Sequence, residues 1–144
     1  ALCRHASEAV FESDRRAVDF ARFGACGTRH PVERPQFIED RTAERELLPV
    51  AAERGIATMI NRPYQRGALF SKSRGKDLPA LAGELDCSSW GQFYLKFILG
   101  HPAVTCIIPA TASLNHMVDN MRANFGPVPD EQQRAEMLRL FEQL

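Results

Sequence analysis

The segment that decides the fold spans residues 90–111, which read WGQFYLKFILGHPAVTCIIPAT. It predicts an amphipathic helix that Ser89 caps in a Ser-x-x-Gln pattern and that Gly100 ends. The inner face of this helix carries Trp90, Phe93, Phe97 and Ile98. A buried strand at residues 103–108 follows, and a loop of small residues then opens another helix. Parallel α/β folds bind phosphates and cofactors in such loops, so we expect any ligand site to lie there.

Composition limits the classes of protein to consider. The chain has 144 residues, of which 44% are hydrophobic and 25% are charged, and these values are typical of one globular domain. Its 18 basic residues balance its 18 acidic residues, which argues against nucleic acid or an anionic membrane as a partner. No apolar run approaches the roughly 20 residues that span a bilayer, and no signal-peptide pattern opens the chain.

Cysteine and histidine usage indicates a cytoplasmic protein without a metal site. The four cysteines are far apart and form no C-x-x-C pair, so we expect small buried thiols in a reducing compartment. The four histidines also lack the spacing of metal ligands. The chain begins with Ala instead of Met, and we therefore expect a fragment of a longer protein.

The first half of the chain predicts fewer regular elements than the second. A helix is expected near residues 14–23, and another begins after Thr42, is kinked at Pro49 and ends at Gly55. Residues 56–60 form an apolar run rich in β-branched side chains, which predicts a strand paired with residues 103–108 through a βα crossover. Residues 61–77 are expected to form one long, functional or mobile loop.

Two more helices are expected after the second strand. Ser113 caps the first of them, and its apolar residues at helical spacing predict a buried face: Leu114, Met117, Val118 and Met121. The methionines of the chain are interpreted as core residues. Asp130 caps the final helix, over residues 130–143.

Chemistry read from the residues alone remains open. The loop at residues 109–113 offers the hydroxyls of Thr111 and Ser113 before a helix, which suits an anion or a plain helix cap. Arg62 and Arg66 follow the first strand and could bind a pyrophosphate or lie in a surface turn. The sequence contains no G-x-S-x-G, no G-x-G-x-x-G and no P-loop.

Three stretches of the chain resemble the C-terminal half of an aldo/keto reductase. They are residues 44–57, 61–70 and 95–120. The most specific match is VTCIIPAT at residues 104–111, followed by Asp119-Asn120. It is similar to the last barrel strand and cofactor loop of that family. The resemblance implies a partial (β/α)8 TIM barrel at residues 36–144, with a degenerate, poorly matching segment at residues 1–35. The final helix matches one that packs outside the barrel.

The resemblance also implies NADP(H) as cofactor and an aldehyde or ketone as substrate. The residues that fall at cofactor contacts are Arg62, Tyr64, Gly67, Leu69, Thr111, Ser113, His116, Asp119 and Asn120. Ala110 and His116 leave the preference between NADP and NAD open, because Lys and Arg would recognise the 2′-phosphate more strongly.

The sequence also lacks several features of the family. Its catalytic Asp, Tyr, Lys and His belong to the first half of the barrel and have no counterpart here, so no catalytic residue is assigned and the chain alone is expected to be inactive. A family strand is expected to be deleted at residues 35–41, and cofactor binding is expected to be weak or lost. The alternative is a non-catalytic remnant or a nucleotide- or protein-binding module.

Overall fold

The computed structural model describes residues 2–3, 32–35, 38–45 and 47–144. The helix expected near residues 14–23 lies outside these ranges. In chain order the elements are β1 (Leu2–Cys3), β2 (Val32–Pro35), α2 (Thr42–Arg45), α3 (Leu47–Glu53), β3 (Thr58–Asn61), the 3-10 helix η1 (Gln65–Gly67), α4 (Leu69–Ser73), α5 (Ala80–Glu84), α6 (Trp90–Leu99), β4 (Cys106–Ile108), α7 (Leu114–Arg122) and α8 (Glu131–Glu142).

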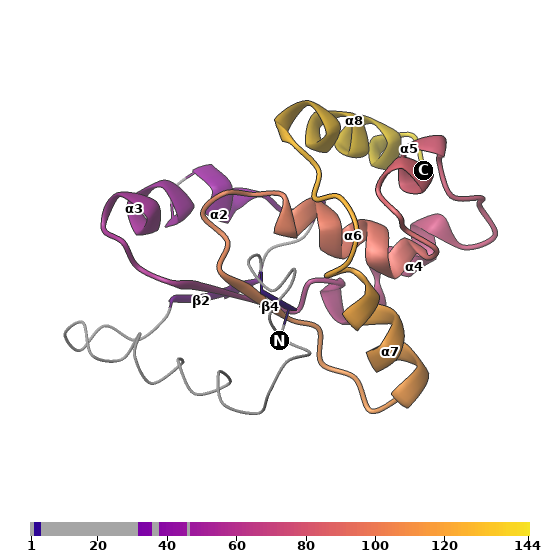
Figure 1. Cartoon of the computed structure of the whole chain (residues 1–144), viewed down its shortest axis with the longest axis horizontal. Helices are drawn as coiled ribbons and strands as arrows, with labels where there is room; N and C mark the ends of the chain where they lie inside the picture. Colours follow the sequence, from indigo (N-terminus) through magenta and orange to yellow (C-terminus); the bar gives the residue numbers. More distant parts are fainter. Residues whose placement is uncertain (1, 4–31, 36–37, 46) are drawn as a thin grey trace.

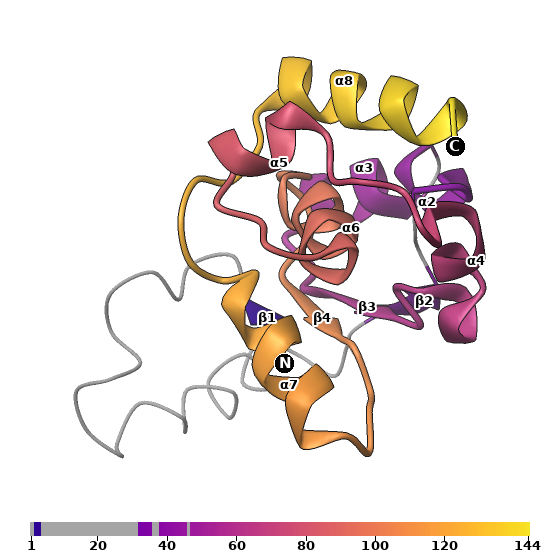
Figure 2. The ribbon, with the colours of Figure 1, turned by 90° about the vertical axis from the view of Figure 1, so that its right-hand side faces the viewer.

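The strands form one sheet, in which Figure 1 labels β2 and β4, and Figure 2 shows the whole order β1-β4-β3-β2. The strands β2, β3 and β4 are parallel, with Met59 opposite Cys106 and Ile60 opposite Ile107. This pairing confirms the prediction that the runs near residues 56–60 and 103–108 are parallel neighbours. The short β1 pairs with β4 in the antiparallel direction. The described strands thus form an open, mostly parallel sheet that does not close into a barrel.

Both central strands begin later than the sequence predicted. Thr58 is buried, and its hydroxyl donates to the carbonyl of Ala103 at 2.6 Å. The backbone N–H of Thr58 in turn donates to the hydroxyl of Thr105. These two hydroxyls satisfy backbone groups where the two chain segments approach each other, and regular β3–β4 pairing begins one position later, with Met59 opposite Cys106.

The deletion of a family strand, expected at residues 35–41, stays a prediction, and the structure has another strand directly before this segment. The strand β2 ends at Pro35 and pairs with β3 in parallel along its length. Its sequence, VERP, carries two charges and a proline, so it lacks the apolar run of a buried strand. An edge strand tolerates such residues, and β2 lies at the edge of the sheet.

The helix expected between Thr42 and Gly55 consists of two pieces, α2 and α3. Pro49 lies in the first turn of α3, where its missing N–H breaks no helical hydrogen bond. Gly55 follows α3 with φ of 62°, a left-handed conformation that suits glycine after a helix. The predicted stop at Gly55 is therefore confirmed.

The linker at residues 61–77 is not one long loop. It contains η1 and α4, and α5 follows before α6 begins. Leu69 of α4 and Ala82 of α5 are both buried in the main core. These helices have only three to five residues, too short for a helical period to show in the sequence.

Helix α6 is the centre of the molecule. All residues from Gly91 to Leu99 are buried, and Figure 2 shows α6 between the sheet on one side and α5 and α8 on the other. The predicted apolar face is confirmed for Phe93, Phe97 and Ile98, and Trp90 is partly buried. A helix that is covered on all sides must also bury its polar residues, here Gln92 and Lys96.

These two polar residues lie four positions apart and both bind the region of α7. The amide nitrogen of Gln92 donates to the Asp119 carboxylate at 2.6 Å. The Lys96 ammonium donates to the carbonyls of Phe125 at 2.6 Å and Pro127 at 3.0 Å, and also to the Leu85 carbonyl. Helix α6 therefore presents a polar stripe to α7 and to the chain that follows it.

The expected buried face of α7 is wrong, because the helix is turned the other way. Leu114 is 68% exposed and Met121 is 41% exposed, and Met117 and Val118 are exposed as well. The polar side of α7 packs inward instead, since Asp119 binds α6 and Asn120 is buried. Met117 and Met121 are thus not core residues, whereas Met137 of α8 is fully buried.

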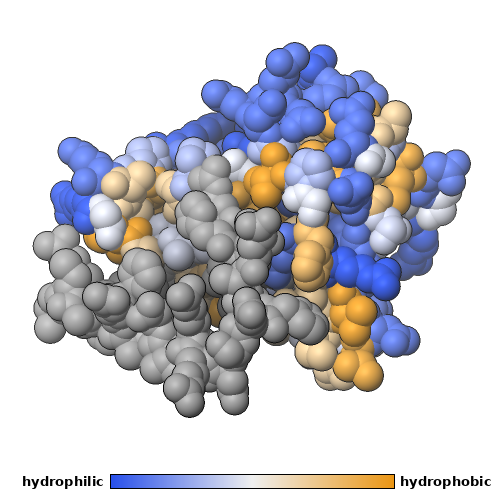
Figure 3. Space-filling model, in the orientation of Figure 1, coloured by the Kyte–Doolittle hydropathy of each residue, from blue (hydrophilic) through white to orange (hydrophobic). Residues whose placement is uncertain are grey.

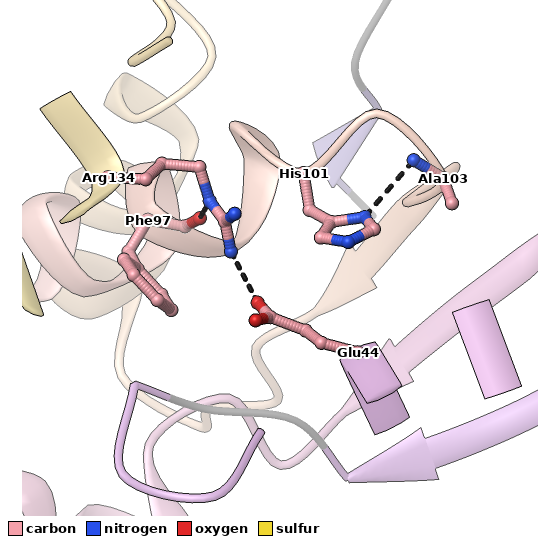
Figure 4. A network of polar contacts seen from close by, with 5 residues as sticks. All are labelled: Glu44, Phe97, His101, Ala103 and Arg134. Atoms are coloured by element: carbon pink, nitrogen blue, oxygen red, sulfur yellow. Dashed lines mark hydrogen bonds and ion pairs between the residues drawn. The ribbon is translucent and has the colours of Figure 1, made fainter. Parts of the chain in front are cut away.

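Helix α8 packs over α6 and is fixed by Arg134 (Figure 4). The helix spans Glu131–Glu142 with a capping box from Asp130, which confirms the predicted final helix. The residue that ends α6, Gly100, has no room for a side chain, because a Cβ there would lie 2.7 Å from the carbonyl oxygen of Pro129. Its φ of −64° would suit any residue.

Within the described ranges, no helix is long and apolar enough to cross a membrane.

Candidate functional site

A cavity of about 770 Å³ lies where β3 and β4 reach their carboxyl ends. Its walls come from the residues after β3, from α4, from the start of α6, and from β4 with its following loop and α7. Trp90, Phe70 and Pro109 supply apolar surface, and Arg62 and Arg66 supply positive charge. The cavity thus combines planar apolar walls with cationic groups, as cofactor sites do.

The segment that carries the two arginines has an unusual backbone. Arg62, Gln65 and Arg66 have φ between 49° and 57°, in the left-handed region that side chains with a Cβ disfavour. Each such residue costs roughly 1–2 kcal/mol unless the surroundings compensate. Strained residues of this kind cluster at functional sites, and these three lie in or beside the cavity lining.

Tyr64 ties this strained segment to α7. Its hydroxyl donates to the Asn120 side-chain oxygen at 2.6 Å and lies 3.3 Å from the Gly91 carbonyl. The Asn120 amide nitrogen donates to the Pro109 carbonyl at 3.4 Å, so Asn120 links the loops after both central strands. Burial and the charge of Asp119 raise the pKa of Tyr64 far above its usual value.

Asp119 is engaged inside the protein through both of its carboxylate oxygens. One accepts from the Ser89 hydroxyl at 2.7 Å and the other from Gln92 at 2.6 Å. A Cβ at Gly91 would lie 3.3 Å from the same carboxylate, so the start of α6 approaches Asp119 closely. These bonds hold α7 against α6 and fix one wall of the cavity.

The two hydroxyls at the start of α7 accept local backbone hydrogen bonds, and that of Ser113 caps the helix. The Thr111 side chain accepts from the N–H of Ser113, and the Ser113 side chain accepts from the N–H of His116. Thr111 also lines the cavity, whereas Ser113 does not. The cap function is therefore present, and it leaves Thr111 and His116 at the cavity wall.

Seven of the nine residues assigned to cofactor contacts line this one cavity. They are Arg62, Tyr64, Gly67, Thr111, His116, Asp119 and Asn120. Two of the nine lie elsewhere, because Leu69 is buried in the core and Ser113 caps α7 outside the lining. The loops singled out in the sequence thus meet at one cavity, and side-chain direction separates these two residues from the other seven.

The contribution of α4 and α6 to the cavity was not predicted from the sequence. Phe70, Ser89, Trp90 and Gly91 line the cavity but were assigned no place in it. The Ser89 cap was recognised, and a helix that starts beside the carboxyl ends of the strands could have pointed to this wall. Among the residues described, no group of three or more His, Cys, Asp or Glu gathers to hold a metal ion.

Proton-donor chemistry can be judged from the tyrosines and Lys96. Burial raises the pKa of Tyr94, and burial and the charge of Asp119 raise the pKa of Tyr64. Burial lowers the pKa of Lys96, whose ammonium donates to three backbone carbonyls. A general acid works best with a pKa near the operating pH, so a tyrosine with a raised pKa is poorly placed for that task.

Comparison with known proteins relates this geometry to one fold. No protein-family model matches the sequence, and no curated protein matches it significantly. Solved structures do match. The holo form of an aldo-keto reductase from Bacillus halodurans has a TM-score of 0.58 and 18% identity, over 90% of this chain and 48% of that one. An aldo-keto reductase from Klebsiella pneumoniae in complex with NADP and acetate has a TM-score of 0.53 and 22% identity, over 76% of this chain and 38% of that one.

A thermostable aldo-keto reductase in complex with the inhibitor epalrestat gives a TM-score of 0.59 at 21% identity, covering 90% of this chain and 46% of that one. The chain therefore spans about half the length, or less, of the solved structures it matches. Such coverage is what the C-terminal half of the barrel would give. The chain has the fold of part of an aldo-keto reductase barrel.

Proposed function

We propose that this chain is the cofactor-binding part of an NADP(H)-dependent aldo/keto reductase, and that it is inactive by itself. The observation that carries the proposal is the single cavity at the strand ends, which joins arginines from one loop to the cap of α7 from another. The Klebsiella pneumoniae structures with the same fold contain NADP or NADPH. The whole reaction would reduce an aldehyde or ketone.

The residues present suit such a cofactor by their chemistry. Arg62 and Arg66 would bind its phosphates, with Thr111 and His116 on the opposite wall. Trp90 and Phe70 would pack against its rings. We assign Asp119 and Asn120 a supporting role, because internal hydrogen bonds already engage their polar atoms. When bound, the cofactor supplies the hydride for carbonyl reduction.

Binding can be measured through Trp90, the single tryptophan, which lines the cavity. We expect NADPH to change its fluorescence with a millimolar dissociation constant, because only part of a cofactor site is present. The double variant Arg62→Gln, Arg66→Gln should weaken binding about tenfold or more, since two charge-assisted hydrogen bonds to phosphate are lost.

The double variant Arg54→Gln, Arg74→Gln is the matched control, because both arginines are exposed and lie outside the cavity lining. It removes the same two positive charges from the chain and should leave NADPH affinity unchanged. Equal weakening by this control would show that net charge alone attracts the cofactor. No fluorescence response at millimolar NADPH would contradict cofactor binding and favour the remnant.

Catalysis is a separate expectation. The purified chain should consume no NADPH with a simple aldehyde above the uncatalysed rate, because neither Tyr64 nor Tyr94 has the pKa of a neutral-pH proton donor. A complete aldo-keto reductase, assayed by absorbance under the same conditions, is the positive control. Steady NADPH oxidation by the pure 144-residue chain would overturn this expectation.

A non-catalytic remnant that binds a nucleotide or a protein is the second candidate. It is favoured by the internally bonded Asp119 and Asn120, which leave fewer polar groups for a ligand. The exposed apolar face of α7 favours a protein partner.

A further inference from the structure

Uncharged side chains of the cavity lining use their hydrogen bonds inside the protein. The Tyr64 hydroxyl donates to the Asn120 side chain at 2.6 Å, and the Asn120 amide donates to the Pro109 carbonyl. The Trp90 indole N–H donates at 3.0 Å to the carbonyl of Lys76, which lies outside the lining. These bonds occupy the groups that could otherwise recognise a ligand by its own donors and acceptors.

The polar side of α7 is engaged in the same way. The two Asp119 carboxylate oxygens accept from the Ser89 hydroxyl at 2.7 Å and from the Gln92 amide at 2.6 Å. Ser89 also accepts the backbone N–H of Gln92 as the cap of α6. The apolar side of α7 faces outward, and Figure 3 shows hydrophobic surface at the lower right, where Figure 1 places this helix. Helix α7 therefore turns its polar side toward the cavity and uses it for internal bonds.

The cationic side chains of the lining differ from these groups. Within the part of the chain that the structure describes, no ion pair or side-chain hydrogen bond engages Arg62, Arg66 or His116. All three side chains line the cavity. A guanidinium group binds phosphate through parallel charge-assisted hydrogen bonds. Phosphate is thus the ligand group that this lining can bind by direct polar contacts.

The aromatic walls of the cavity are held in place from behind. Phe70 packs against Tyr64 with ring centres 5.0 Å apart, and Trp90 packs against Phe93 at 5.5 Å. The fully buried Tyr94 contacts both walls, at 5.8 Å from Phe70 and 5.7 Å from Trp90. Rings that are already fixed lose little freedom when a planar group packs against them. Such walls accept any planar ring, because every nucleobase has a π face.

We propose that the cavity selects a phosphate that carries a planar ring and does not recognise the edge of that ring. The ligand class then includes nucleoside monophosphates with either purine. A site that hydrogen-bonds the base rejects the wrong base strongly, because its polar groups lose their partners. Here those groups have partners within the protein, so exchange of adenine for guanine leaves none of them unpaired. This selectivity rests on the proposed function, because the cavity is taken to be the cofactor site.

The test is an NMR titration of the isotopically labelled 144-residue chain, followed through the indole N–H resonance of Trp90. Trp90 is the single tryptophan, so this resonance is unique, and nucleotide absorption does not disturb it. AMP and GMP should bind with dissociation constants within about threefold of each other. Ribose 5-phosphate, which lacks the ring, and adenosine, which lacks the phosphate, should each bind about tenfold more weakly or worse.

Phe70→Leu separates ring packing from phosphate binding. It removes one aromatic wall and should weaken AMP and GMP equally, by about fivefold, while ribose 5-phosphate binds as before. Phe125→Leu is the matched control, because Phe125 is 62% exposed and lies outside the cavity lining. It should leave the affinities for all three ligands unchanged. The backbone amide spectra of the same samples establish that each variant is folded.

A titration of NADPH under the same conditions separates failure of this selectivity from failure of the proposed function. If NADPH binds and AMP binds about tenfold or more tightly than GMP, the base is recognised, and only the selectivity is overturned. Ribose 5-phosphate that binds as tightly as AMP would overturn it as well, because the ring would then contribute nothing. If neither NADPH nor either nucleotide shifts the Trp90 resonance, both the selectivity and the proposed function fail.

Discussion

Lys96→Met should lower the free energy of unfolding by about 3 kcal/mol, because it removes the donor of three backbone carbonyls at once. Lys96 is fully buried in α6. Its ammonium binds Leu85, Phe125 and Pro127, which belong to two different connections of the chain. Methionine fills a similar volume and offers no N–H, so the carbonyls lose their partner without a large cavity. Urea unfolding followed by circular dichroism measures the change.

The Lys96 ammonium also binds carbonyls at the ends of two other helices. Leu85 ends α5 and Phe125 follows α7, so the ammonium carries positive charge to the carboxyl ends of two helices. Gly126 lies between two of the carbonyls with φ of 73°, and this left-handed turn helps both to converge on the ammonium. The control is Lys72→Met, which removes a 43% exposed side chain and its ion pair with Glu39. Its effect should stay below about 1 kcal/mol. Equal losses of unfolding free energy in the two variants would show that the buried Lys96 ammonium contributes no more to stability than an exposed lysine does.

Most of the fold could be predicted where apolar runs are long or strongly periodic. The two central strands, α6 and α8 follow from their sequences because each buries a face whose period shows within the segment. The strand β2 could not be predicted, because an edge strand is held by backbone hydrogen bonds and VERP has no pattern to display. The short helices between β3 and α6 are defined by packing in the core.

The orientation of α7 shows the limit of pattern reasoning most directly. Its apolar spacing indicates a helix correctly and predicts the buried side wrongly. The inward side of α7 is bound by polar groups from other parts of the chain, because Ser89 and Gln92 bind Asp119 and Tyr64 binds Asn120. A pattern within one segment cannot reveal such a partner. The same holds for the cavity, where the loops were foreseen but the wall formed by the start of α6 was not.

Arg134→Met should lower the free energy of unfolding by about 2–3 kcal/mol, because one side chain joins three elements. The Nε of Arg134 donates to the Phe97 carbonyl at 2.8 Å, and its guanidinium lies 4.5 Å from the centre of the Phe97 ring. The same guanidinium forms an ion pair with Glu44 of α2 (Figure 4). Both charged side chains are only 12% and 14% exposed, so removal of one leaves the other poorly solvated.

The matched control lies on the same helix. Arg139→Met removes an ion pair with Glu136 whose arginine is 67% exposed, and its effect should be near zero. Glu44→Gln with Arg134→Met completes a double-mutant cycle by urea unfolding, and the coupling should be about 1 kcal/mol or more, since the partners are in contact. Additive effects would mean that Arg134 acts only through Phe97. In that case the link from the last helix to α2 would contribute nothing to stability.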